Sequence, residues 1–405
     1  MTAGLLLGAT PRATGLRYAP DFRLGIGGRP APAALRNAVT SVRYEDGTGA
    51  ADRVEVGVAN VDLRFLQRHI RGLGTGFLPD AVQVGPSRLA PGPAGLFDID
   101  NRLTLAMGYG PDGLVDMFDG EITGVEASFS GGGVPSMTIV AHDKLHRLTT
   151  GTAARGFGPL PDALVAAILG AENLIIPLID PAVVAASTAL AVVNYVFGGT
   201  GRKQKGQSDF ELLKEIAATY DADFWVEGDV LYLARFVPKE YASRLTLRWG
   251  ESLLDFSPKV TTVGQVAAVA MKFTLREIPL SFLVTVGWDF DREAVRFVVL
   301  PGEAAAGAKA VSGPAYTIID QPITSPADIA TSALTIYHEL RGKLNSRMTG
   351  SGSAVGDPRI RAGAVVTLDG LGPDFGGDYR VAGATHAIDA GGYRTTFQLR
   401  KEILP

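Results

Sequence analysis

The chain has 405 residues and a formal net charge of −4, with a sequence pI near 5.8. A chain of this length usually forms more than one hydrophobic core, so we expect two or three domains. The mild acidity excludes the strongly basic surface that holds nucleic acid, and the absence of cysteine excludes disulfides, thiolate metal sites and cysteine catalysis. With 46% hydrophobic and 20% charged residues, the composition is typical of a globular protein.

The N-terminal segment has little hydrophobic periodicity, and a region with strand-like alternation follows it. Residues 1–34 are rich in Gly, Pro and Arg, which predicts an N-terminal arm. Over residues 35–158, short alternating apolar runs are separated by glycine turns, and the pair Asp46-Gly47 between two such runs predicts a hairpin. We therefore expect a first small β-barrel domain over this range.

The apolar period changes over residues 159–245, which predicts an α+β middle module. Ser208 and Glu211 have the spacing of a capping box at the start of a helix. The pair Gly228-Asp229 then predicts a second hairpin. The buried stripe of the capped helix is expected to contain Phe210, Leu213, Ile216, Ala217 and Tyr220.

An apolar segment at residues 181–197 lies within this module. It is shorter than the roughly 20 residues that a membrane-spanning helix needs. We therefore expect a buried helix here and no membrane span.

Residues 246–405 return to strand character and predict a second β-barrel domain. One helix is expected within it at residues 325–345, with Ser325 as its cap and Pro326 at its first position. The expected fold class is thus mainly β, with two similar small β-barrel domains per chain and an α+β module between them.

Two stretches of the chain echo each other, one beginning at Phe118 and the other at Phe375. Each reads Phe, any residue, Gly and an acid, followed by a strand with an interior glycine, a glycine-rich turn and a second strand. Interior strand glycines often mark the bulges and bends that close barrels, and we assign this role to Gly120, Gly124, Gly377 and Gly383. The echo reflects either one duplicated barrel or a pattern that any two hairpins share.

The sequence does not predict an enzyme, a metal site or a cofactor site. His142 and His146 are four residues apart, but they follow a predicted strand, where that spacing does not suit a metal. Asp98 and Asp100 lie in a stretch that lacks the glycine and the distal glutamate of a calcium loop. His386 is expected in solvent or at the edge of the core. We therefore expect no catalytic, metal-binding or cofactor-binding residues.

A longer pattern near the C-terminus resembles a known family. Residues 349–400 read TGSGSAVGDPRIRAGAVVTLDGLGPDFGGDYRVAGATHAIDAGGYRTTFQLR. This succession of a GDPR turn, a GLG-containing hairpin and a final GGY strand resembles the phage late control D family, which are baseplate hub proteins of contractile tails and injection systems. Upstream segments resemble the family's first barrel and middle module, so the resemblance covers most of residues 36–405. One departure is Phe290, where the family often has proline.

The resemblance implies a structural protein and not an enzyme. It implies a homotrimeric ring that adapts a hexameric inner tube above it to a trimeric spike below it, with baseplate wedge or LysM-type adaptor proteins around it and no stable nucleic acid binding. Because the chain ends at Pro405 without an OB-fold or needle, the spike is expected to be a separate protein. Assembly is expected in the cytoplasm, followed by incorporation into a phage-like particle or a virion tail baseplate.

The candidate interface is the loop that contains Gly356, Asp357, Pro358, Arg359 and Arg361. Its glycine permits unusual backbone conformations, its Asp-Pro pair favours a turn, and its arginines can pair with carboxylates. The loop either shapes a barrel rim and an inter-subunit contact or forms a turn within one domain. Two alternative functions are a cell-wall-degrading baseplate protein, which predicts a catalytic cluster, and a carbohydrate-binding one, which predicts exposed aromatic residues along a groove.

Overall fold

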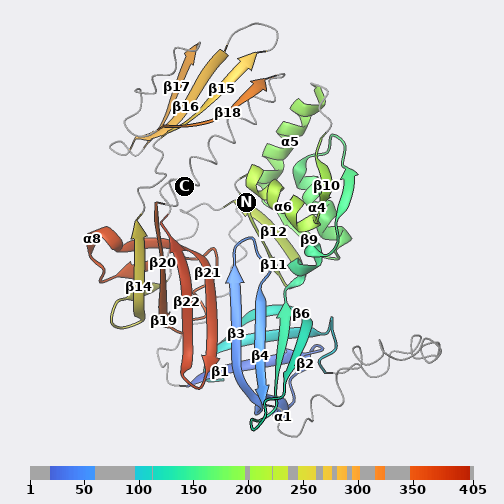
Figure 1. Cartoon of the computed structure of the whole chain (residues 1–405), viewed down its shortest axis with the longest axis vertical. Coiled ribbons are helices and arrows are strands. Elements are labelled where there is room, and N and C mark those ends of the chain that lie inside the picture. Colours follow the sequence, from blue (N-terminus) through green and yellow to red (C-terminus); the bar gives the residue numbers. More distant parts are fainter. Residues whose placement is uncertain are drawn as a thin grey trace, which may run out of the picture. The chain divides into compact units, whose positions relative to one another are not determined.

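The chain is mainly β, as the sequence predicted, and it divides into two compact units (Figure 1). The computed structural model describes residues 19–59, 96–111, 113–196, 201–220, 222–235, 245–260, 268–275, 281–289, 294–301, 315–323 and 347–401. The first unit comprises Met1–His146, Ser353–Arg361 and Gly383–Phe397, and the second comprises Arg147–Gly352, Ala362–Ala382 and Gln398–Pro405. Two C-terminal segments that the sequence patterns placed in a second barrel therefore belong to the first unit.

The first unit is built on antiparallel strands that begin earlier in the chain than the sequence predicted. Residues 19–34 of the expected arm include two strands and the start of a short helix, α1 (Ala33–Arg36), and the first strand pairs with β5 along its whole length. The strands are β1 (Pro20–Ile26), β2 (Arg29–Pro30), β3 (Val39–Gly47), β4 (Arg53–Ala59), β5 (Arg102–Tyr109), β6 (Gly113–Ser128) and β7 (Ser136–His142). Their order in the sheet is β3-β4-β7-β6-β5-β1-β2.

These strands surround one hydrophobic core because each alternates buried and outward residues. In β4 the three valines are fully buried, and the residues between them are only partly buried. Every long strand of the unit contributes to the same cluster, for example through Leu24, Val42, Val56, Leu105, Ile122 and Ile139. Each such side chain contributes roughly 1.5–3 kcal/mol on burial.

β-bulges bend this sheet at three places. The register shifts between Val39 and Ser41, between Leu105 and Ala106, and between Ile122 and Gly124. A bulge adds local twist and bends the strand, so the sheet curls around its core. Among the strand pairings of the described residues, however, none joins β1 to β3, and the curled sheet is not closed into a barrel.

A further set of strands, most of them near the C-terminus, lies partly in the second unit. These are β13 (Thr246–Arg248), β14 (Leu253–Val260), β19 (Met348–Val355), β20 (Val365–Asp369), β21 (Gly377–Asp389) and β22 (Gly392–Arg400), with helix α8 (Gly372–Phe375) before β21. Strands β19, β21 and β22 each begin in one unit and end in the other. The pairing order is β13-β20-β21-β22-β19-β14, and these strands likewise do not close into a barrel in the described part.

The two sets of strands have the same order. In the first set the order β1-β5-β6-β7-β4-β3 matches β13-β20-β21-β22-β19-β14 in the second, strand for strand and in the same succession along the chain. One difference is that β1 pairs with β5 antiparallel, whereas β13 pairs with β20 parallel. Agreement of six strands is more than two unrelated hairpins require, so the order supports a duplicated architecture.

The middle module lies in the second unit and has the predicted α+β character. Its helices are α4 (Asp162–Glu172), α5 (Pro181–Val196) and α6 (Asp209–Thr219), and its strands are β8 (Ala153–Gly156), β9 (Ile176–Ile179), β10 (Lys203–Gln207), β11 (Ala222–Glu227) and β12 (Val230–Arg235). The capping box of Ser208 and Glu211 is confirmed in both directions, and β11 and β12 form the predicted hairpin. On α6 the buried residues are Leu212, Leu213, Ile216 and Ala217, with Tyr220 just after it, whereas Phe210 is only partly buried.

A separate sheet follows the middle module. Its strands are β15 (Ala268–Leu275), β16 (Ser281–Asp289), β17 (Ala294–Pro301) and β18 (Ala315–Ile323), in the order β17-β16-β15-β18. We expected these residues within a second barrel, but none of these strands pairs with β13–β14 or β19–β22 in the described part of the chain. The helix predicted at residues 325–345 and the departure at Phe290 lie outside the described residues.

The expectation of a buried helix at residues 181–197 was wrong about burial. Residues Pro181–Val196 do form helix α5, but among its side chains whose burial is described only Val183, Ser187 and Ala191 are buried, whereas Val192 and Tyr195 are 58% and 72% exposed. The segment is apolar on nearly all sides, so its sequence could not indicate which side meets the core. No helix in the described ranges combines the length and hydrophobicity that crossing a lipid bilayer requires.

Candidate functional site

The predicted loop begins at a glycine that packs against an aromatic ring. A Cβ on Gly356 would lie 2.1–2.5 Å from ring atoms of Tyr393, so no larger residue fits. The Gly356 N–H donates to the Tyr393 carbonyl (3.0 Å), and the Tyr109 hydroxyl donates to the Gly356 carbonyl (3.0 Å). The glycine is therefore needed for close packing, and its contacts anchor the loop to β22 and β5.

The next residues form a compact turn around a buried carboxylate. Asp357 is 3% exposed and accepts hydrogen bonds from the Arg359 backbone N–H (3.0 Å), Nε (2.9 Å) and Nη2 (2.6 Å). The Asp357 N–H donates to Thr395 Oγ1 (3.2 Å), and Pro358 lies within the turn. These bonds raise the pKa of Arg359, chiefly through the hydrogen bond to Asp357. Arg359 is thus paired within its own loop.

Arg361 points back into the first unit. Its Nε lies 2.5 Å from Asp46 Oδ2 and its Nη2 donates to the Tyr44 hydroxyl at 2.7 Å. The guanidinium also lies over the Tyr44 ring, 5.2 Å from its centre. Tyr44 in turn donates to Asp52 Oδ2 at 2.5 Å. Arg361 therefore bridges the loop to β3 and to the turn that follows it.

This cluster holds more acid than base. Asp52 and Asp143 lie close enough to Asp46 for its charge to act on both, and the Asp143 N–H donates to the Asp52 carbonyl at 3.1 Å. Burial raises the pKa of Asp52 well above its usual value, and the Asp46 charge raises it further. Burial also raises the pKa of Asp143 to about 7. The positive charge of Arg361 offsets part of this repulsion.

His386 is fully buried at the centre of this region, contrary to the expectation of solvent or the core edge. Its Nε2 lies 2.8 Å from the Ile360 carbonyl, and its Nδ1 lies 2.9 Å from the Tyr393 hydroxyl and 3.0 Å from Thr395 Oγ1. Because the carbonyl can only accept, Nε2 carries the proton in the neutral ring. Burial, and then the charge of Arg361, lower the pKa of His386 to about 4. The ring therefore joins the loop to β21 and β22 as a neutral group.

The four glycines assigned to barrel bends have different environments. A Cβ on Gly120 would lie 2.2 Å from the His142 carbonyl oxygen, so it allows close strand contact. Gly124 lies beside a bulge in β6, where a bend was predicted. Gly377 begins β21 with a φ of 105°, which favours glycine. Gly383 opens the pairing of β21 with β3, and a Cβ there would lie 3.3 Å from the Asp46 carbonyl.

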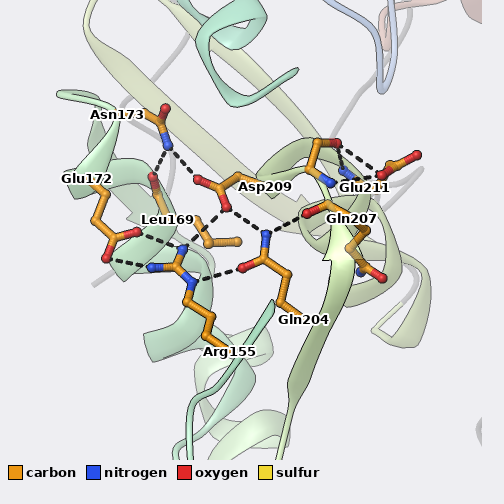
Figure 2. Close-up of polar contacts among 9 residues, drawn as sticks. Arg155, Leu169, Glu172, Asn173, Gln204, Gln207, Asp209 and Glu211 are labelled. Carbon is orange, nitrogen blue, oxygen red and sulfur yellow. Dashed lines mark hydrogen bonds and ion pairs between the residues drawn. The ribbon is translucent and has the colours of Figure 1, made fainter. Parts of the chain in front are cut away.

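The sequence did not predict a polar network in the middle module (Figure 2). Arg155 on β8 donates to Gln204 Oε1 (2.8 Å) and Glu172 Oε1 (2.9 Å), and it contacts Asp209 Oδ1 (3.3 Å). Asn173 bonds Asp209 Oδ2 at 3.0 Å. Figure 2 shows Arg155 between the end of α4 and the start of α6. The network joins elements far apart in the chain, so no local motif indicates it.

The same module exposes apolar residues on one face of the β9-β12-β11 sheet. Ile176 and Leu178 of β9 are 62% and 43% exposed. Strand pairing and the pleat place Tyr232 and Trp225 on that face, where their rings stack with centres 5.2 Å apart. Leu174, which precedes β9, is 77% exposed with a φ of 59°. The sequence did not predict this exposed surface, because the apolar residues 173–179 (NLIIPLI) have a pattern typical of a buried strand.

The rings of the histidine pair are held by other polar groups. The rings of His142 and His146 lie 6.2 Å apart, with His142 Nδ1 2.7 Å from Thr123 Oγ1 and His146 Nδ1 2.6 Å from the Asp143 carbonyl. No group of three or more potential ligands is placed to hold a metal among the described residues. Taken together, the described polar clusters fasten loops and strands to one another.

The structure has relatives among solved structures. The 43 kDa tail protein of prophage MuSo2 from Shewanella oneidensis aligns with a TM-score of 0.59 at 11% identity, over 94% of this chain and 98% of that one. A tail protein from Neisseria meningitidis aligns at 0.58 and 12% identity, over 95% and 97% of the two chains. The chain shares the fold of these tail proteins.

A third relative comes from a secretion system. The Escherichia coli protein c3393, described as a component of the type VI secretion system with structural similarity to the T4 tail proteins gp27 and gp5, aligns at 0.51 and 11% identity, over 94% of this chain and 80% of that one. No protein-family model and no curated protein sequence matches the chain. At these identities the likeness concerns the fold.

Proposed function

We propose that the protein is a structural baseplate hub of a phage-like tail or a contractile injection system, without enzymatic activity. Three copies form a ring that adapts a hexameric inner tube to a trimeric spike. The observation that carries this proposal is the repeated strand order of β1-β5-β6-β7-β4-β3 and β13-β20-β21-β22-β19-β14. The shared fold with a prophage tail protein and a second tail protein supports it.

The repeat matters because of symmetry. A closed ring of three identical chains has threefold symmetry, whereas a hexameric tube presents six equivalent binding surfaces. Two similar sheet domains per chain give the ring six near-equivalent units, so one ring can contact all six tube subunits. Its opposite face can retain three equivalent sites for a trimeric spike.

The remaining partners belong to the same proposal. We infer that the inner tube protein binds on one side, the spike protein on the other, and wedge or LysM-type adaptor proteins around the ring. Assembly takes place in the cytoplasm, and the hub then becomes part of the particle. The candidate loop at residues 356–361 serves chiefly within the first unit, since Arg359 and Arg361 have partners there. Its contact with another subunit stays a prediction.

Measurement of the oligomeric state tests the proposal. Size-exclusion chromatography with light scattering should give three times the chain mass of 42.5 kDa for the protein alone, or a larger complex that contains three copies of the chain when the tube protein is present. Electron microscopy of that species should show a ring with six similar lobes. A species that stays monomeric with the tube and spike proteins at high concentration contradicts the proposal.

The cell-wall-degrading alternative has its own assay. Purified protein would be incubated with peptidoglycan, and soluble fragments would be measured. Release of fragments that scales with protein concentration would favour that function over a structural hub. Binding to immobilised glycans by the monomer would favour the carbohydrate-binding alternative.

A further inference from the structure

Among the strand edges that lack a partner strand in the described part of the chain, one lies on β6 and one on β14. β6 pairs with β5 as far as Glu121, and Ile122 bonds Asn101 on the same side. Beyond that point the edge of residues 123–128 opposite β7 meets no described strand. The second such edge belongs to β14, which ends the sheet order after β19. Unpaired edges of this kind present backbone donors and acceptors to any strand that fits.

The chain itself shows how such an edge is filled. β21 first pairs with β20, from Leu368↔Gly377 to Val365↔Arg380. It then pairs with β3, from Gly383↔Gly47 to Ile388↔Val42. One edge of β21 is therefore shared between a strand of its own set and a strand of the other set.

The repeated order identifies the equivalent strands. β6 takes the place of β21, β5 that of β20, and β14 that of β3. In the first set, β5 covers the first part of β6 as β20 covers the first part of β21. In the described ranges, no strand takes the place of β3 beside the second part of β6. The counterpart of β3 is β14, which follows β6 in the chain and belongs to the other unit.

We propose that β14 of one copy pairs antiparallel with residues 123–128 of β6 in the next copy, as β3 pairs with β21 within one chain. This inference deepens the proposed function and rests on ring assembly. The contact joins two different surfaces, so it is head-to-tail, and such contacts form a closed ring when the rotation between copies allows it. Around the ring, the β3–β21 pairing within each chain then alternates with the β14–β6 pairing between neighbouring chains.

The exposed side chains on both edges fit burial against another strand. On β14, Leu254 and Val260 are 46% and 47% exposed, and Phe129 just after β6 is 65% exposed. Pro258 in β14 has no N–H and ends a ladder there, which limits the pairing to the preceding residues. Main-chain hydrogen bonds supply the association, and these apolar residues add buried area.

Cysteine cross-linking tests the junction, because the natural chain has no cysteine. Glu126→Cys on β6 would be combined in one chain with Leu254→Cys, Asp255→Cys or Ser257→Cys on β14, all at exposed positions. After oxidation of the assembled protein, at least one combination should give cross-linked trimers on a non-reducing gel. Cβ atoms across a strand pair are close enough for a disulfide.

Two controls identify the direction of the contact. A mixture of chains that carry Glu126→Cys alone with chains that carry the β14 cysteine alone should give dimers and no trimers, since each chain then has one thiol. Glu126→Cys combined with Lys203→Cys, an exposed residue of β10, should give at least about tenfold less product because it lacks strand-pair geometry.

The outcomes separate this inference from the proposed function. Trimers by light scattering with no cross-link from any β14 position overturn the strand pairing and leave the ring intact. A chain that stays monomeric with its partners overturns both. Dimers from Glu126→Cys alone indicate a twofold contact between β6 edges and also overturn the pairing.

Discussion

Replacement of Arg361 by methionine removes the positive charge that joins the 356–361 loop to β3 and leaves a side chain of similar length. Asp46 and Tyr44 lose one hydrogen bond each, at 2.5 and 2.7 Å. A hydrogen bond to a charged group contributes roughly 1.5–3 kcal/mol, which gives about 3–6 kcal/mol for the pair. The Arg361 side chain is 31% exposed, so water compensates for part of the lost hydrogen bonding, and we expect the free energy of unfolding to fall by about 3 kcal/mol.

Thermal denaturation followed by circular dichroism measures the stability loss, and hydrogen exchange shows where it occurs. In Arg361→Met, the amides of Ile360 and of residues 42–46 should exchange faster, because the loop no longer holds to β3. The loss should be smaller at pH 5 than at pH 8, since the carboxyl of Asp143, whose pKa is raised to about 7, is protonated at the lower pH and repels its neighbouring carboxylates less.

Arg359→Ala is the matched control. In the described part of the chain, the side chain of Arg359 also makes two hydrogen bonds and is also 31% exposed, so its removal should cost a similar amount, about 3 kcal/mol. Its partner Asp357 lies within the same turn, so exchange in β3 should stay unchanged. Faster exchange in β3 that appears equally in Arg359→Ala, or a stability loss in Arg361→Met that does not vary with pH, would show that Arg361 does not fasten the loop as argued.

Four other changes test separate features. Burial raises the pKa of folded Asp143 to about 7, so its contribution to folding stability is present at low pH and is lost as pH rises toward 7. Asp143→Asn should therefore reduce the fall of the unfolding free energy with pH by up to about 1.4 kcal/mol per pH unit in urea titrations, and an unchanged pH dependence contradicts the shift. The pKa of folded His386 is lowered to about 4, so its contribution to folding stability is present above the ordinary pKa of 6.5 and is lost as pH falls. His386→Gln should therefore reduce the loss of stability between pH 6.5 and pH 4, and an identical midpoint of acid denaturation contradicts this. Leu174→Gly should raise the unfolding free energy by about 1 kcal/mol because the φ of 59° is strained for leucine, and a lower melting temperature refutes this. Gly356→Ala should cost about 1–3 kcal/mol through its clash with Tyr393, and an unaltered melting curve would show that the ring moves freely.

Local chemistry in the sequence determined several elements before any long-range contact was known. The capping box of Ser208 and Glu211 depends on residues three positions apart, so it is readable from the chain. The hairpin at Gly228 was predicted from the pair Gly228-Asp229, and in the structure this glycine adopts a φ of 59° in the turn between β11 and β12. The first hairpin was predicted as well, although β3 includes Asp46 and Gly47 and the turn follows at residues 48–52. Resemblance to late control D proteins supplied the hub hypothesis, which the residues alone did not.

Other features depended on contacts between distant residues, and only the tertiary structure decided them. Arg361 and Asp46 are 315 positions apart, so the sequence could offer the arginine for an inter-subunit contact or for its own domain with equal reason. Helix α5 is apolar on nearly every side, and its burial depended on which neighbours it met. The shared order of the two strand sets is likewise a property of pairing, because an alternating strand pattern states which face is buried but not which strand lies beside it.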